Sequence, residues 1–238
     1  MMRSCMIATA LVAWHGPGGS QELVRHALGE FQYVAATHGV LIAAPHGTSD
    51  VNTAPIATDA ARLAGAGYVV TSRFFVDKVR LNVNRPTEGA FLPCAQEART
   101  ERAKSVYDAY TGILEKAAGG NPLRLYVEVH GNSNPKTEQN IEVATVGFTA
   151  AEVRAVKDGY AAILARVRDS ARDYPELALL IEPADRITYT AGCTKKIGAF
   201  TLAPRGVHFE FPRTARDRNT IAASAVLVAE IVRLLDKP

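Results

Sequence analysis

Two histidines and a carboxylate in this chain have the residue types of a metal-binding site. His46 and Asp50 lie in the segment Ala-Pro-His-Gly-Thr-Ser-Asp, and His130 lies much later in Val-Glu-Val-His-Gly-Asn-Ser. Two imidazoles and one carboxylate are a ligand set of catalytic zinc sites, which keep a further position open for water. We therefore predict that these three residues bind Zn²⁺. The alternative is that both histidines are hydrogen-bonded loop residues and that Asp50 caps a helix.

Each histidine follows a short apolar run, residues 40–44 in one case and 123–129 in the other. Such runs, bounded by Pro or Gly, are typical of buried strands that end where the chain turns. Loops at the carboxyl ends of strands are where an open α/β sheet places its active site. The shape of the loop over residues 48–58 is not fixed by its sequence, so Asp59 is a rival to Asp50 as the carboxylate ligand.

A second group of polar residues has the chemistry of an anion site. Asn84 and Arg85 precede Pro86, which favours an extended conformation at Arg85 and directs its side chain away from the turn. A guanidinium binds a carboxylate through paired hydrogen bonds, so we predict that Arg85, with Asn84 beside it, binds an acidic substrate. Arg73 or Arg80 would stabilise a developing oxyanion. The alternative is a surface loop in which Arg85 forms a salt bridge.

A candidate general base lies near the C-terminus, in Gly-Val-His-Phe-Glu-Phe-Pro. Strand alternation puts Phe209 and Phe211 on one face and His208 and Glu210 on the other. A carboxylate in such a setting suits proton transfer from metal-bound water, which makes Glu210 the predicted base. The alternative is an edge strand with a solvent face. Tyr189, in a Gly/Thr-rich segment, is predicted to form part of the pocket wall.

The composition is that of a globular protein, with 238 residues, 47% hydrophobic and 21% charged. The formal net charge of +3 is too small to indicate nucleic-acid binding, and Lys and Arg do not form runs with interleaved aromatics. No segment reaches the ~20 apolar residues of a membrane span, so we expect no stable membrane association. We predict one domain over residues 25–238.

The rest of the chain alternates between predicted strands and amphipathic helices. The helices cover about residues 97–118, a segment that opens with the capping box of Thr149 and Glu152, and about residues 217–236. The pattern predicts an α/β fold of three layers, α/β/α, with a mixed, largely parallel central sheet. The predicted strands are 40–44, 68–71, 123–129, 141–145, 178–181 and 207–211.

The N-terminal segment leaves the location of the protein open. Residues 1–24 are a possible leader or flexible segment, with Arg3 before an apolar stretch over residues 6–14. We expect a cytoplasmic protein, or an exported one if residues 1–13 are a signal peptide. Removal of a leader with Cys5 would leave Cys94 and Cys193 as a possible disulfide pair. The alternative is three unrelated thiols, and none of them has metal-type spacing.

The order of these motifs resembles a known family. His-Gly-x-x-Asp after a strand, Asn-Arg-Pro, a strand-end His and a late Glu shortly before a Pro are similar to the N-formylglutamate amidohydrolases and related zinc hydrolases with a zinc-carboxypeptidase-like fold. The resemblance covers about residues 32–213. It implies zinc ligation by His46, Asp50 and His130.

The same resemblance implies roles for the remaining residues. Arg85, with Asn84, matches the arginine that holds the substrate carboxylate, and Glu210 matches the catalytic glutamate. Glu128, two residues before His130, matches an acidic partner of the zinc histidine. The motifs depart in detail, with Pro-His-Gly-Thr in place of Pro-His-Ser-Gly and Asn-Val-Asn-Arg in place of Asp-Leu-Asn-Arg.

The function implied is a zinc-dependent hydrolase. It would cleave an amide bond in a small carboxylate-bearing substrate such as an N-acyl amino acid, N-formylglutamate or a short peptide. The alternative is a non-catalytic relative that binds a small molecule.

Overall fold

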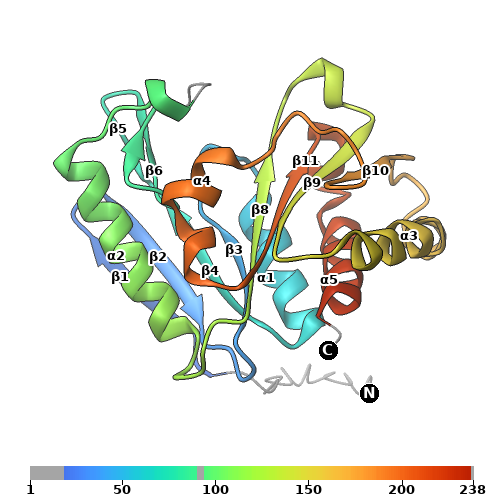
Figure 1. Ribbon diagram of the computed structural model, residues 1–238, viewed down its shortest axis with the longest axis horizontal. Coiled ribbons are helices and arrows are strands. Elements are labelled where there is room, and N and C mark those ends of the chain that lie inside the picture. The colour runs from blue at the N-terminus through green and yellow to red at the C-terminus, as the bar shows by residue number, and fades with distance from the viewer. Residues whose placement is uncertain (1–18, 90–93, 237–238) are drawn as a thin grey trace, which may run out of the picture.

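A mixed sheet of eight strands forms the middle layer of the molecule (Figure 1). The computed structural model describes residues 19–89 and 94–236. The strand order is β1-β2-β4-β3-β8-β11-β9-β10. The bounds are β1 (Glu22–His26), β2 (Gly29–Val34), β3 (Val40–Ala44), β4 (Gly67–Ser72), β8 (Leu125–Gly131), β9 (Asn140–Val146), β10 (Ala178–Ile181) and β11 (Arg205–Phe211).

Helices cover both faces of this sheet. On one face lie α1 (Thr53–Ala64), α3 (Ala150–Ser170) and α5 (Ile221–Leu235), and on the other lie α2 (Glu101–Ala117) and the 3-10 helix η3 (Ala199–Leu202). Strand β3 has an apolar core on both sides, because alternate side chains of a strand point to opposite faces. Ile42 packs in the core under α1 and α5, and its neighbour Leu41 packs in the core under α2. The predicted three-layer α/β/α fold is confirmed.

The strands that carry or lead to the candidate site residues run side by side in one direction. β3 pairs in parallel with β4 and with β8, and β8 pairs in parallel with β11. Their carboxyl ends therefore meet at one edge of the sheet. The register places Glu210 of β11 directly beside His130 of β8.

A small sheet and several short helices surround that edge. The small sheet has three strands, β5 (Phe75–Val76), β6 (Val79–Asn82) and β7 (Thr87–Glu88). It leads towards the 3-10 helix η1 (Cys94–Gln96). The remaining short helices are η2 (Pro135–Thr137), α4 (Gly192–Ile197) and η4 (Arg213–Arg216).

The predicted elements are all present; strands 40–44 and 178–181 have the predicted ends, and the other elements have shifted ends. The capping box of Thr149 and Glu152 forms as predicted. Helix α2 begins at 101, later than predicted, because the side chain of Thr100 accepts a hydrogen bond from the backbone of Ala103. The last helix begins at Ile221, later than predicted, because the chain first makes a turn in which the backbone N–H of Thr220 donates to the carbonyl of Asp217 at 2.9 Å.

The elements that were not predicted are β1, β2, α1, the small sheet and the short helices. Helix α1 follows Asn52, which has a left-handed backbone and gives no side-chain cap, so its start lacks a sequence signal. The predicted domain boundary at residue 25 falls inside β1, and the candidate leader residues 1–13 and Cys5 lie outside the described residues. Within residues 19–89 and 94–236, no helix is long and apolar enough to cross a membrane.

Candidate metal centre

Three donor atoms converge at the carboxyl ends of β3 and β8. His46 Nδ1 lies 3.1 Å from His130 Nδ1, and Asp50 Oδ2 lies 3.4 Å and 3.2 Å from these two nitrogens. Zinc bonds of ~2.0–2.2 Å in a tetrahedron place neighbouring ligand atoms about 3.3–3.6 Å apart, which is close to the 3.1–3.4 Å between these three donors. All three residues are at least nine-tenths buried. The donor set and its spacing therefore fit a zinc ion.

The turn after β3 brings Asp50 beside His46. The backbone N–H of Asp50 donates to the carbonyl of His46 at 2.8 Å, which closes a single turn between them. Gly47 packs against β4, where a Cβ atom would lie 2.5 Å from the carbonyl oxygen of Thr71. Oδ1 of Asp50 lies 3.5 Å from Arg80 Nη1, so that Oδ2 is the oxygen that faces the histidines.

Asp59, the rival ligand, lies elsewhere. It is on helix α1, where its half-exposed carboxylate lies 3.7 Å from Arg62. A helix begins at Thr53, so the loop is short and carries Asp59 away from the histidines. Asp50 is the carboxylate that the structure brings to them.

A fully buried carboxylate, Glu128, contacts the ring nitrogen of His130 that points away from His46 and Asp50. Its oxygens accept hydrogen bonds from Asn84 Nδ2 at 2.9 Å and from Tyr126 Oη at 2.9 Å. Nε2 of His130 lies 2.9 Å from Oε2 of Glu128. An ionised carboxylate only accepts hydrogen bonds, so Nε2 carries a hydrogen, and in the neutral ring that binds a metal the lone pair is on Nδ1, towards His46 and Asp50. Burial would raise the pKa of Glu128, but hydrogen bonds from His130 and His208 hold it below its usual range.

The charges at the centre favour a cation. Burial, and then the charge of Arg80, lower the pKa of His46 to about 3. Burial would also lower the pKa of His130, but hydrogen bonds to Asp50 and Glu128 outweigh it and raise that pKa to about 9. Two carboxylates thus draw positive charge to His130, and a divalent ion at Nδ1 would meet the same attraction.

Glu210 lies beside the three donors. His208 Nε2 is 3.2 Å from its Oε1, and Asn132 Nδ2 is 3.4 Å from its Oε2. Phe209 and Phe211 are fully buried in the core on the opposite face, as the alternation predicts. His208 also reaches Glu128 through Nδ1 at 3.2 Å, so it joins Glu210 to the carboxylate behind His130.

One cavity of about 300 Å³ is lined by the three donor residues and by Asn132, His208 and Glu210. Arg80 and Tyr189 also line it. Arg73 does not: its exposed side chain lies 3.4 Å from Glu30. The fully buried side chain of Asn84 is bonded to Glu128 and likewise does not line the cavity.

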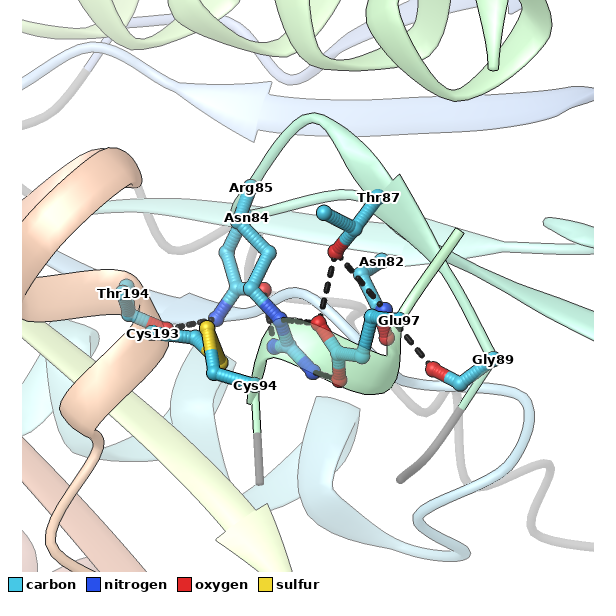
Figure 2. Close-up of a disulfide and its surroundings, with 9 residues drawn as sticks. All are labelled: Asn82, Asn84, Arg85, Thr87, Gly89, Cys94, Glu97, Cys193 and Thr194. Carbon is cyan, nitrogen blue, oxygen red and sulfur yellow. Dashed lines mark hydrogen bonds and ion pairs between the residues drawn. A yellow bond between two sulfur atoms is a disulfide. The ribbon is translucent and has the colours of Figure 1, made fainter. Parts of the chain in front are cut away.

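Arg85 lines the cavity, but one edge of its guanidinium is already hydrogen-bonded to a carboxylate of the protein (Figure 2). Nε and Nη2 donate to the two carboxylate oxygens of Glu97 at 2.8 Å and 2.5 Å. Thr87 Oγ1 donates to the same carboxylate at 2.7 Å, and Nη1 of Arg85 donates to Asn84 at 3.1 Å. The salt bridge that was the alternative for Arg85 is therefore present, although it is buried.

A disulfide joins two walls of the cavity. Cys94 of η1 and Cys193 of α4 are bonded, with their Cα atoms 5.5 Å apart (Figure 2). Thr194, next to Cys193, lies within 3.4 Å of Asn84 Nδ2. The sequence had left this pair open between a disulfide and separate thiols.

Sequence reasoning missed several residues of the site. Glu97 contacts Arg85, and Asn132 contacts Glu210. Glu142 accepts hydrogen bonds from the backbone N–H groups of Thr188 and Tyr189 at 2.8 Å and 2.9 Å. The sequence gives no local signal for Glu142, because its pairing with Glu210 of β11 appears only in the register of the folded sheet.

No protein-family model and no curated protein sequence matches the chain. Solved structures do match. One is a protein of Shewanella amazonensis SB2B provisionally named a metallopeptidase, at 14% identity and a TM-score of 0.51, covering 91% of this chain and 86% of that one.

Two further matches have lower TM-scores. An N-formylglutamate amidohydrolase from Ralstonia eutropha JMP134 matches at 12% identity and a TM-score of 0.47, over 87% of this chain and 97% of that one. A metallo-carboxypeptidase from Burkholderia cenocepacia matches at 11% identity and 0.47, over 91% and 65%. At these identities the similarity concerns the fold. The chain thus has the mixed, largely parallel α/β fold that the family resemblance implied, shared with the Shewanella protein.

Proposed function

We propose that this protein is a zinc-dependent hydrolase that cleaves an amide bond in a small carboxylate-bearing substrate, such as an N-acyl amino acid or short peptide. The observation that carries the proposal is the convergence of His46 Nδ1, Asp50 Oδ2 and His130 Nδ1, 3.1–3.4 Å apart, beside Glu210 in one cavity. A bound Zn²⁺ would lower the pKa of a water molecule and polarise the substrate carbonyl.

Glu210 is the proposed proton carrier. Its carboxylate takes a proton from the attacking water as the carbon–oxygen bond forms. It then gives that proton to the leaving nitrogen as the carbon–nitrogen bond breaks, so the base is regenerated. His208 and Asn132 each contact one of its oxygens and keep the group facing the cavity.

Arg80 is the proposed donor to the carbonyl oxygen on which negative charge develops. It lines the cavity, and one contact of its Nη1 is a long one of 3.5 Å to Asp50. Among the described residues, its buried Nε has no hydrogen-bond partner. Because that nitrogen is shielded from solvent, the Nη groups of Arg80 are the ones proposed to donate to the substrate oxygen.

The substrate carboxylate is proposed to bind at the side of the cavity formed by Arg80 and Arg85. Because Glu97 occupies the fork of Arg85, that arginine can offer the substrate only the N–H groups that Glu97 and Asn84 leave free. Tyr189 lines the same cavity, whose volume of about 300 Å³ suits a small molecule.

A metal analysis coupled to a substrate screen tests the proposal. The dialysed protein should retain about one zinc per chain, consistent with three converging ligands. It should hydrolyse members of a panel of N-acyl amino acids and short acidic peptides, and a chelator should abolish the activity. Bound zinc without turnover on any member would favour the non-catalytic alternative. A protein without bound metal that is nevertheless active would overturn the proposal.

A further inference from the structure

A buried arginine behind the candidate metal centre binds three separate segments of the chain. Arg216, the last residue of η4, is 6% exposed. Its guanidinium donates to three backbone carbonyls: Nη1 to Val51 at 2.5 Å, Nη2 to Asn132 at 2.8 Å and Nε to Phe211 at 3.2 Å.

Each of these carbonyls belongs to a segment that carries a site residue. Val51 follows Asp50, Asn132 lies two residues after His130, and Phe211 follows Glu210. The segments come from the turn after β3 and from the ends of β8 and β11. One planar group with three fixed donor directions therefore sets the relative position of two proposed zinc ligands and the proposed base.

Further contacts lock this arrangement. The backbone N–H of Asn132 donates to the carbonyl of Phe211 at 3.0 Å, and Asn52 Nδ2 donates to the carbonyl of Arg216 at 2.7 Å. The guanidinium also lies directly against Gly131, where a Cβ atom would be 2.2 Å from Cζ of Arg216. Only glycine at position 131 leaves room for the guanidinium as it stands.

Arg216 is a buried, charged side chain whose hydrogen-bond partners are backbone groups. Its three hydrogen bonds go to neutral carbonyl groups, although a buried cation is costly without a charged partner. Burial lowers the pKa of Arg216, and the nearby charges of Asp50 and Glu210 oppose that shift. The two carboxylates of the site therefore favour the charged form of Arg216.

We propose that Arg216 is a positioning residue of the metal centre. It fixes the spacing of Asp50, His130 and Glu210 through the backbone, and the zinc affinity of the protein depends on it. The proposal rests on the proposed zinc site, but it concerns a residue that touches neither metal nor substrate.

The test measures zinc affinity, by competition with a chelating indicator, in Arg216→Gln, Arg216→Lys and Gly131→Ala. Gln cannot reach three carbonyls, Lys keeps only the charge, and the methyl group of Ala displaces the guanidinium. We expect the zinc dissociation constant to rise about 10–100-fold, as for other residues that orient ligands. The absorption spectrum of the Co²⁺-loaded variants should change as well, because the ligand geometry relaxes.

Arg124→Lys is the matched control. Arg124 also donates to a backbone carbonyl, that of His38 at 2.9 Å, but at the other end of β8. This variant should lower the melting temperature of the metal-free protein without changing zinc affinity or the Co²⁺ spectrum.

Each outcome decides the proposal. Zinc affinity and Co²⁺ spectra equal to wild type in folded Arg216 and Gly131 variants would overturn it while leaving the zinc site intact. If none of the three variants folds, Arg216 is structural only and the proposal is also overturned. A wild-type protein that binds no zinc would instead refute the proposed function on which the inference rests.

Discussion

The two sides of the cavity are built in different ways. On one side, His46, His130 and Glu210 stand at or just beyond the ends of neighbouring parallel strands, and backbone ladders fix their spacing. On the other side, Arg80 and Arg85 belong to the small-sheet region, which is held by the Glu97 ion pair and the Cys94–Cys193 disulfide. The strand side has the proposed metal ligands and the proposed base, and the cross-linked side has the two proposed substrate-binding arginines, of which Arg80 is also the proposed oxyanion donor. Damage to the first side should affect chemistry. Damage to the second should affect stability and selectivity, and loss of Arg80 should also affect turnover.

The largest expected effect belongs to the strand side. Glu210→Gln should keep bound zinc, because Glu210 is outside the converging donor set, and should lower turnover roughly 10²–10⁴-fold, as loss of a general base does. Turnover and zinc content measured on the same sample check this. Full activity with zinc retained would assign proton transfer to another group.

The next effect belongs to the buried ion pair of the cross-linked side. Arg85→Ala leaves the carboxylate of Glu97 buried without its partner, so the free energy of unfolding should fall by about 3–5 kcal/mol. Denaturant titration measures the loss, and Arg85→Ala combined with Glu97→Ala should recover part of it. The recognition role of Arg85 is separate. Where the variant folds, a carboxylate-bearing substrate should lose more affinity than the same substrate with its carboxylate amidated, and equal losses would argue against that role.

Removal of the disulfide should have a smaller effect. Cys94 and Cys193 are 99 residues apart in the sequence, so the double Ser variant should lose about 2–4 kcal/mol of stability through the freer unfolded chain. Zinc affinity should stay near wild type, because the donor atoms are fixed by β3 and β8. A large loss of zinc from the double variant would contradict the division into two sides.

The smallest effect is expected at Arg73. Its exposed side chain pairs with Glu30 away from the cavity, and an exposed pair contributes only ~0.2–1 kcal/mol. Arg73→Ala should therefore leave turnover unchanged, whereas Arg80→Ala should lower it. Steady-state rates of the two variants side by side would show whether the proposed oxyanion donor is Arg80 or Arg73.

The same contrast explains what the sequence could predict. The convergence of His46, His130 and Glu210 on one edge of the sheet was predictable, because the two histidines follow apolar runs and Glu210 lies in an alternating strand, and strands leave such signals locally. Glu97 and Arg216 were not predictable, because their roles depend on partners that only the fold brings near. Arg85 lies between these cases. Its residue type indicated a carboxylate partner, and the structure supplies that partner from within the chain.

Zinc content in a matched pair of variants tests the central claim most directly. Asp50→Asn and Asp59→Asn make the same chemical change at the two candidate carboxylates, one facing the histidines and one exposed on α1. We expect about one zinc per chain in wild type and in Asp59→Asn after dialysis, and little or none in Asp50→Asn. Equal zinc content in the two variants, or loss only in Asp59→Asn, would contradict the metal centre described for His46, Asp50 and His130.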